Sequence, residues 1–351
     1  MTQSCFSRVT IDPKKLQANY TLLQKKVGAG CSVAGVVKAD GYGLGIDVVV
    51  PALEDAGCRF FYVAQLEEAL IARSLTDCPV AILGGLPEGC EKIYHQHSLI
   101  PVLNTLGEIA RCPVDLPAIW HVDTGMNRLG IDPQDVPELL KNHPAPLLMM
   151  THFSSSDERD DAPSVAQVAL FDSVVPPSFA HSICNSSGIF KNALWHRQQV
   201  RAGMALYGLN PTPEFSNPMS GVVQLEARIL QIRAAKAGET VGYNRTYTLP
   251  ADARLATIGI GYADGFLRSG SNRTALYWNG QACPVVGRVS MDLVVVDITH
   301  LQGLAPQEGH WMEVIGVHQS ADQLAASWGT IGYEVLTSLG ARAERVVLSV
   351  S

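Results

Sequence analysis

The sequence predicts an α/β protein, in which a TIM (β/α)8 barrel is followed by a smaller, mainly-β domain. Short apolar runs alternate with amphipathic segments through the first part of the chain. A proline-rich bridge at residues 210–218 ends this alternation, and strand-like segments separated by glycine turns follow it. A chain of 351 residues is also longer than one hydrophobic core usually organises. We therefore expect two domains, at residues 1–219 and 220–351.

The overall composition is that of an ordinary globular protein, with 47% hydrophobic and 17% charged residues. A net charge of -7 argues against nucleic acid or an anionic membrane as the main partner. No stretch approaches the roughly 18 uninterrupted apolar residues of a membrane helix. Residues 1–10 also lack the regions of a secretory signal. We therefore expect a cytoplasmic protein.

The N-terminal segment predicts a strand and then a helix. Phe6, Arg8 and Thr10 alternate as in a strand, which is a candidate member of the second domain. Asp12 and Pro13 then supply an N-cap and a first-turn proline for a helix that ends near Gly28.

Eight apolar runs follow, and each predicts a short buried strand. They are residues 32–37, 60–64, 80–83, 99–103, 118–122, 147–151, 179–182 and 199–201. The segments between them have helical periodicity; between the second and third runs, Leu66, Ala69 and Leu70 share one helix face. Buried strands that alternate with helices pair in parallel, and eight such units closing on themselves form a TIM barrel. An open doubly wound sheet is the alternative. Polar residues at the strand ends favour the barrel, whose chemistry lies there.

Six strand-like segments and a late helix are expected in the second domain. The strands are residues 221–232, 255–260, 274–278, 283–287, 293–298 and 311–316, and the helix lies near 321–339.

The stretch at residues 36–45 predicts a reactive amine. An apolar strand ends at Lys38, and glycines at alternate positions follow. A lysine at the mouth of an apolar strand loses hydration, so its neutral form, which can form an imine with an aldehyde, is favoured. The glycines allow the backbone to approach a ligand closely. A solvated lysine at a strand-loop junction is the other interpretation.

Four more polar stretches follow predicted barrel strands. Arg128 lies in a glycine-bounded loop and suits a substrate carboxylate. His152 ends the sixth strand, and residues 185–188 and 201–204 follow the last two strands with hydroxyls and backbone N–H groups that suit an anion. Each alone has a structural explanation, as a surface ion pair, a core histidine or a helix cap. Five such stretches at the same rim favour an active site.

Two turns of the second domain also carry polar residues. Tyr262 stands on a glycine-flanked turn after an apolar strand, with spacing that is wrong for a dinucleotide fingerprint. Residues 287–292 form another tight turn between strands.

No metal site is expected. The eight cysteines include no C-x-x-C pair and should be free thiols. His95 and His97 lack further ligands nearby.

The order of these motifs resembles the alanine racemases, which are pyridoxal-phosphate enzymes of the fold-type III group. Beyond the lysine stretch, the motifs read DTGMNRLG, THF, NSSG, VRAGMALYG, GYADG, GRVSMD and IGYEVLTSLG, along nearly the whole chain. The resemblance implies the cofactor pyridoxal 5'-phosphate, alanine as the substrate, and D-alanine supply for peptidoglycan. It also implies a homodimer in which Tyr262 and the turn at 291–292 reach the partner's site.

The resemblance assigns roles to individual residues. The implied catalytic pair is Lys38, which would bind the cofactor covalently, and Tyr262. The implied cofactor-binding residues are Lys38, Tyr42, Leu83, His152, Asn185, Ser186, Arg201, Gly203 and Met204. Within this set, Tyr42, Ser186, Gly203 and Met204 would hold the phosphate, Arg201 would face the pyridine nitrogen, and His152 would pack on the ring. The implied substrate-binding residues are Arg128, Met291 and Asp292.

The chemistry is consistent with these roles. A racemase removes the α-proton from one face and returns a proton to the other, so it needs two bases on opposite sides. Lys38 and Tyr262 can form that pair. An arginine beside the ring nitrogen, such as Arg201, would leave this nitrogen unprotonated and so suppress transamination.

This chain departs from the family pattern at two positions. Many relatives carry a lysine, often carbamylated, where His121 stands, so Arg128 must be oriented otherwise. Relatives often offer a phosphate-binding tyrosine where Ala341 stands.

Three other functions stay open from the sequence. The first is a serine or broad-specificity racemase, which would share the same chemistry. The second is a non-catalytic pyridoxal-phosphate-binding barrel, against which the second domain counts. The third is a fold-type III decarboxylase, which usually has a cysteine-containing loop that Cys283 does not provide.

Overall fold

The computed structural model describes residues 5–301 and 305–349, so the first four positions of the segment 1–10 lie outside the described residues. The chain divides into two compact units. One contains residues 14–220, and the other combines residues 1–13 with 221–351. The N-terminal strand therefore belongs to the same unit as the C-terminal part of the chain.

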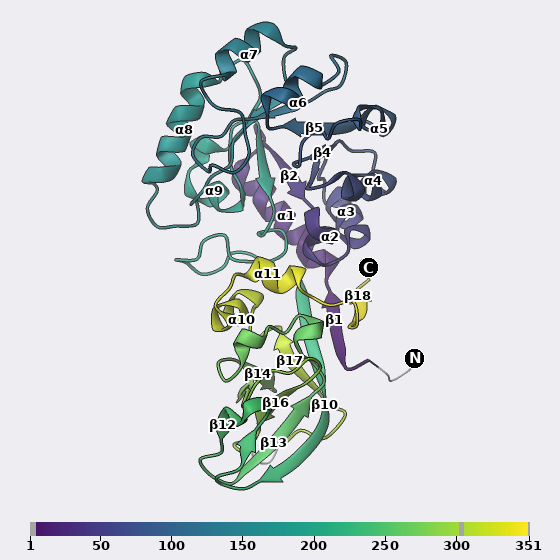
Figure 1. Ribbon diagram of the computed structural model, residues 1–351, viewed down its shortest axis with the longest axis vertical. Coiled ribbons are helices and arrows are strands. Elements are labelled where there is room, and N and C mark those ends of the chain that lie inside the picture. Colours follow the sequence, from purple (N-terminus) through teal and green to yellow (C-terminus); the bar gives the residue numbers. More distant parts are fainter. Residues whose placement is uncertain (1–4, 302–304, 350–351) are drawn as a thin grey trace. The chain divides into compact units, whose positions relative to one another are not determined.

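Residues 14–220 form a nearly closed barrel of eight parallel strands (Figure 1). The strands are β2 (Ser32–Val36), β3 (Phe61–Val63), β4 (Val80–Ile82), β5 (Leu99–Leu103), β6 (Ile119–His121), β7 (Leu148–Met150), β8 (His181–Ser182) and β9 (Gln199–Ala202). They are paired in the order β8-β7-β6-β5-β4-β3-β2-β9. At the seam between β8 and β9, the Arg201 N–H donates to the Cys184 carbonyl at 2.9 Å. The predicted barrel and all eight of its strands are confirmed, and the open doubly wound sheet is wrong.

Helices follow most of the strands and cover the outside of the barrel (Figure 1). They are α1 (Pro13–Val27), α3 (Ile46–Asp55), α4 (Leu66–Leu75), α5 (Glu91–Gln96), α6 (Leu106–Arg111), α7 (Val136–Asn142), α8 (Ala162–Val174) and α9 (Ser186–Lys191). The predicted first helix is confirmed, with Pro13 in its first turn and Gly28 after its last residue at a φ of 78°. Strand residues such as Phe61, Val80 and Val102 are fully buried, because both faces of a parallel sheet are covered.

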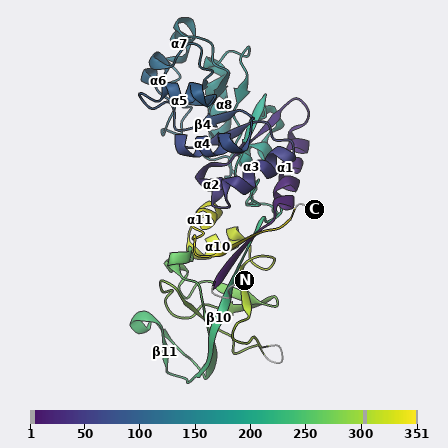
Figure 2. The same ribbon diagram turned by 90° about the vertical axis from the view of Figure 1, so that its right-hand side faces the viewer.

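The second unit is built on a branched sheet around β10 (Val223–Ala235), its longest described strand (Figures 1 and 2). The other strands of this sheet are β1 (Ser7–Ile11), β13 (Ala253–Ile258), β14 (Ala275–Trp278), β15 (Gln281–Pro284), β16 (Val294–Asp297), β17 (Trp311–Ile315) and β18 (Glu344–Val347). A separate two-stranded sheet consists of β11 (Thr240–Val241) and β12 (Tyr247–Thr248). β1 pairs antiparallel with β10 and parallel with β18. All six predicted strands are present, with shifted ends.

The predicted late helix is wrong in one respect, because the structure has two helices there. They are α10 (Ala321–Trp328) and α11 (Gly332–Thr337). Gly329 ends the first of them with a φ of 75°, a left-handed cap that glycine adopts without a steric penalty.

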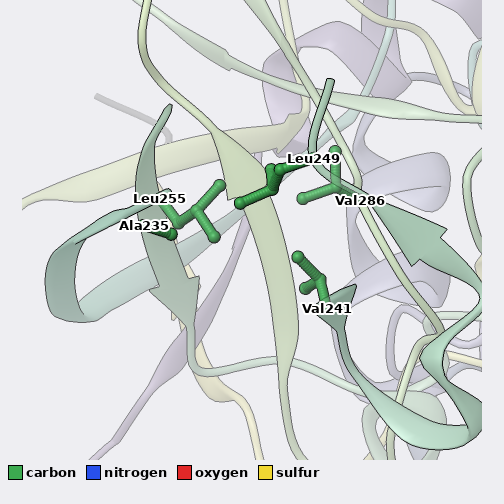
Figure 3. Close-up of a cluster of buried hydrophobic side chains, with 5 residues drawn as sticks. All are labelled: Ala235, Val241, Leu249, Leu255 and Val286. Carbon is green, nitrogen blue, oxygen red and sulfur yellow. The ribbon is translucent and has the colours of Figure 1, made fainter. Parts of the chain in front are cut away.

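A small apolar cluster forms where the short β11–β12 hairpin lies near β13. Figure 3 shows its five buried members, Ala235, Val241, Leu249, Leu255 and Val286. These residues come from separate segments of the second unit, so their burial ties the hairpin to the sheet.

Candidate active site

Lys38 lies two residues beyond the end of β2, at the start of a left-handed turn, α2 (Lys38–Tyr42). Ala39, Asp40 and Tyr42 all have positive φ angles, of 53°, 53° and 56°. Left-handed helical geometry costs about 1–2 kcal/mol for each such non-glycine residue. The Asp40 Oδ1 accepts the Ile46 N–H at 2.8 Å and helps to hold the turn. Strain of this kind is found where the surrounding structure enforces it, often at functional sites.

The environment of Lys38 favours its neutral amine. Burial lowers its pKa, the Arg128 guanidinium lowers it further, and the Glu68 carboxylate opposes these effects. Glu68 is fixed because its Oε1 accepts the Ala39 N–H at 2.6 Å and its Oε2 accepts the Ala64 N–H at 2.8 Å. A lysine with a lowered pKa can attack an aldehyde carbon as the neutral amine.

Tyr42, Ser186 and Gly203 meet in one cluster. The Tyr42 ring stacks on Tyr207, with ring centroids 4.3 Å apart. The Ser186 Oγ accepts the N–H groups of Gly203 at 3.0 Å and of Ala205 at 3.3 Å, and none of its described contacts uses its own proton. A Cβ added at Gly203 would overlap the Tyr42 hydroxyl. This packing therefore requires glycine at position 203.

Arg201 is a buried cation with no ion pair among the described residues. Only 3% of its surface is exposed. Its Nη1 donates to the carbonyl and the Oγ of Ser182, at 2.8 and 2.6 Å. Its Nη2 donates to the Thr151 carbonyl at 2.6 Å and lies 3.3 Å from the Nδ1 of His152. Its Nε makes no hydrogen bond within the described part of the chain, so this N–H can serve a ligand.

Asn104 fixes the tautomer of His121. The Asn104 Nδ2 donates to the Val102 carbonyl at 2.8 Å and to the Leu83 carbonyl at 3.2 Å, so the amide oxygen faces His121. This oxygen lies 2.8 Å from the His121 Nδ1. An amide oxygen can only accept, so Nδ1 carries the proton and Nε2 keeps its lone pair. His121 therefore offers a neutral acceptor at the end of β6.

Both histidines of the site are neutral near pH 7. Burial lowers the pKa of His121 to about 4, and Arg201 and Arg128 lower it as well. Burial holds the pKa of His152 well below its usual value, and the same two arginines lower this pKa further. The positive charge of the site therefore comes from the arginines and not from the histidines.

Arg128 is exposed on a loop that the Asp123 side chain holds in place. The Asp123 Oδ1 accepts three successive N–H groups, of residues 125–127, at 2.9, 2.9 and 3.2 Å. A bridge between Val122 and Ile131 closes the base of the loop. The Arg128 guanidinium makes no hydrogen bond or ion pair with any described residue. It is therefore available for an anionic ligand.

The barrel residues fit pyridoxal phosphate. Lys38 supplies an amine for the aldehyde, and Ser186 supplies a hydroxyl for the phosphate. The Nε of Arg201 supplies an N–H that is not used within the described chain, and Arg128 supplies an exposed guanidinium. These are the groups that an anionic heterocyclic aldehyde requires.

The remaining predicted barrel residues lie at the same strand ends. Leu83 follows β4, and its carbonyl accepts from Asn104. Asn185 caps α9, with its Oδ1 3.0 Å from the Gly188 nitrogen, so Asn185 and not Ser186 is the helix cap. Met204 follows Gly203 after β9.

Tyr262, Met291 and Asp292 lie in the other unit, where two turns meet. The Tyr262 N–H donates to the Ser290 carbonyl at 3.1 Å, and the Ala263 N–H donates to the Met291 carbonyl at 3.0 Å. Tyr262 and Met291 have 43% and 53% of their surfaces exposed. The predicted site residues thus form two groups, one in each unit.

Three residues of these groups were not identified from the sequence. Glu68 could have been suspected, because it stands three residues after Gln65 at a helix start, as in a capping box. Asn104 and Arg342 gave no signal, because their partners are distant in the sequence; the Arg342 guanidinium donates to the carboxylates of Asp264 and Asp292 in the second group. No group of three or more potential metal ligands occurs in residues 5–301 and 305–349. Within the same ranges, no helix has the length and apolar character needed to cross a membrane.

This chain is similar to known proteins over nearly its whole length. The family model described as "Alanine racemase, N-terminal domain" matches residues 11–211, and "Alanine racemase, C-terminal domain" matches residues 222–347. A protein of Methylobacterium nodulans named alanine racemase is 44% identical, over 98% of this chain and 96% of its own. A protein of Agrobacterium fabrum named catabolic alanine racemase is 39% identical, over 96% of this chain and 91% of its own. Among solved structures, the chain resembles the crystal structure of alanine racemase from Bartonella henselae with covalently bound pyridoxal phosphate, with a TM-score of 0.92. The two sequences are 37% identical, and the match covers 98% of this chain and 99% of that one.

Proposed function

The chain belongs to the alanine racemase family, and we propose that it interconverts L-alanine and D-alanine with pyridoxal phosphate as its cofactor. The observation that carries this proposal is the set of charged side chains at the mouth of the barrel. A lysine with a lowered pKa, a buried arginine and an exposed arginine lie there at the ends of strands. The cofactor would be held by Lys38 until the substrate's amine takes the place of Lys38, and would then withdraw electrons from the substrate's Cα and so acidify its proton.

Two bases then act on opposite faces of the substrate. The Lys38 Nζ takes or returns a proton on one face, and the Tyr262 Oη does so on the other. The lowered pKa of Lys38 supports its part, because a lysine amine must be neutral to accept a proton. The exposure of Tyr262 supports the second part, because a base that serves another subunit must project from its own.

The arginines bind and orient the ligands. We assign the unused Nε–H of Arg201 to the pyridine nitrogen, which then stays unprotonated because a guanidinium does not readily release its proton. Arg128 binds the substrate carboxylate. The neutral Nε2 of His121 is an acceptor that Arg128 can use in place of the lysine, often carbamylated, that the family resemblance leads us to expect at this position. His152, held beside Arg201, packs on the cofactor ring.

The phosphate lies with the cluster of Tyr42, Ser186 and Gly203. The Ser186 proton is directed to the phosphate, because the serine oxygen already accepts two backbone N–H groups. Met204 follows Gly203 in this loop. Leu83 and Asn185 border the same rim, as part of the cofactor pocket.

The active enzyme is a homodimer with shared active sites. Lys38 and Tyr262 lie in different units of one chain, and a two-fold dimer would let each barrel receive the partner subunit's Tyr262. We also assign the product D-alanine to peptidoglycan synthesis. The relative from Agrobacterium fabrum is named catabolic, so growth of a D-alanine auxotroph that expresses this chain would test the biosynthetic role.

The test uses purified protein. The absorbance band of the lysine-bound cofactor should be present in the native chain and lost in Lys38→Ala. The circular dichroism signal of L-alanine should decay when the protein is added, and so should the signal of D-alanine. Both signals should decay faster than the signal of serine does. A faster reaction with serine would favour the broad-specificity alternative. Bound cofactor without racemisation of any amino acid would refute the enzymatic proposal.

A further inference from the structure

Arg342 joins the two turns that carry Tyr262 and Met291. Its Nε donates to the Asp264 Oδ1 at 2.8 Å, and its Nη1 donates to the Asp292 Oδ1 at 2.8 Å. Asp264 is the last residue of the short helix that begins at Tyr262. One guanidinium therefore holds a carboxylate from each turn.

The Asp264 carboxylate also fixes the backbone at the start of the tyrosine turn. Its Oδ2 accepts the Gly261 N–H at 2.9 Å, and Asp264 is only 8% exposed. Without Arg342, this buried carboxylate would keep only the Gly261 contact among the residues that the structure describes. It would also face Asp292 as a second, uncompensated negative charge, which would push the two turns apart.

The backbones of these segments touch directly. A Cβ at Gly261 would overlap the Met291 carbonyl, and a Cβ at Gly265 would overlap the Ser338 carbonyl. The Gly340 N–H donates to the Asp264 carbonyl at 3.1 Å. Three chain segments, residues 261–265, 290–292 and 338–342, thus form one tightly packed body in which Arg342 supplies the charged link.

The Tyr262 side chain contrasts with this tightly packed backbone. It is 43% exposed, and its hydroxyl makes no hydrogen bond within the described part of the chain. A tightly packed backbone that presents a reactive group is the arrangement expected where orientation matters for a reaction.

We propose that Arg342 is a positioning residue for racemisation, which sets the Tyr262 phenol through Asp264, while Asp292 anchors the other side of the Arg342 guanidinium. The inference rests on the proposed role of Tyr262 as the second base. Arginine suits this place because its planar fork donates to two carboxylates in fixed directions, whereas a lysine ammonium binds as a point charge.

The test measures the two half-reactions separately. Deuterium from solvent enters L-alanine or D-alanine when either base exchanges the α-proton, and initial rates are followed for each enantiomer. Tyr262→Phe should slow exchange from one enantiomer far more than from the other. Arg342→Ala should slow the same enantiomer by about 10- to 100-fold, the loss expected for a misplacement of about 1 Å. Arg342→Lys should lie between Arg342→Ala and the native chain.

A double-mutant cycle distinguishes positioning from general damage. If Arg342 acts through Tyr262, Arg342→Ala combined with Tyr262→Phe should be no slower than Tyr262→Phe alone. The matched control is Arg8→Ala, which breaks the ion pair with Glu344 at 2.9 Å in the same unit and should leave both exchange rates unchanged. Cofactor absorbance and thermal midpoints of all variants report whether the fold is retained.

The outcomes separate the two proposals. Equal slowing of both enantiomers by Arg342→Ala and Arg342→Lys, or additive effects with Tyr262→Phe, would overturn the positioning role alone. If Tyr262→Phe slows neither enantiomer selectively, the base role fails and this inference fails with it.

Discussion

Gly203→Ala tests whether the predicted phosphate cluster is as tight as the structure shows. The added methyl group would overlap the Tyr42 hydroxyl and lie 3.1 Å from the Tyr42 Cζ. Tyr42 cannot swing away easily, because it is 6% exposed and stacks on Tyr207. Overpacking of this kind costs about 1–3 kcal/mol of unfolding free energy. We expect a loss in this range, measured by urea denaturation without added cofactor.

A second substitution separates the steric effect from cofactor binding. Tyr42→Phe removes the overlapping oxygen, so Gly203→Ala with Tyr42→Phe should recover stability to within about 1 kcal/mol of Tyr42→Phe alone. Cofactor titration should still show weaker binding in the double variant, because the hydroxyl is lost. Gly30→Ala is the matched control, since its new methyl group would meet no atom within 4 Å. A cost of Gly203→Ala no greater than that of Gly30→Ala, or no recovery with Tyr42→Phe, would refute this reasoning.

Three further predictions concern the charges of the barrel mouth. The pKa of His121 is about 4 in the folded chain and about 6.5 in the unfolded chain. The stability that the neutral ring provides is therefore present above pH 6.5 and is lost as the pH falls towards 4. The stability difference between the native chain and His121→Gln should therefore shrink by about 3 kcal/mol between pH 7 and pH 4, and a pH-independent difference in urea denaturation would contradict this. Glu68→Gln removes the anion that raises the pKa of Lys38, so the pH at which Lys38 binds pyridoxal phosphate should shift downward in an absorbance titration; an upward shift would be inconsistent with the contact. Arg201→Glu should promote pyridoxamine phosphate formation during turnover, detected by chromatography, and no increase would show that Arg201 does not control the ring nitrogen.

The barrel could be predicted from the sequence because its signals are local. Apolar runs such as residues 99–103 are buried on both faces, and Pro13 and Gly28 mark the ends of a helix by their backbone preferences. The chemistry-bearing side chains follow these runs directly. Their clustering then follows from parallel pairing, which brings the carboxyl ends of the strands to one rim.

The contacts that complete the site could not be predicted from local sequence signals. β1 pairs with strands more than two hundred positions away, and the Arg342–Asp264 pair joins residues 78 positions apart. The glycines after Lys38 predicted close backbone approach, but not that Ala39 and Asp40 would also become left-handed. That conformation is set by the surrounding hydrogen bonds rather than by the preferences of alanine and aspartate.

Mixed dimers test the central claim most directly. One subunit would carry Lys38→Ala and the other Tyr262→Phe, with a different affinity tag on each so that the mixed dimers can be isolated from co-expressing cells. If each barrel uses the tyrosine of the partner subunit, one of the two sites regains both bases, and the mixed dimer should have about half the activity of the native dimer. Mixed dimers as inactive as the two parent variants would contradict a shared two-base site.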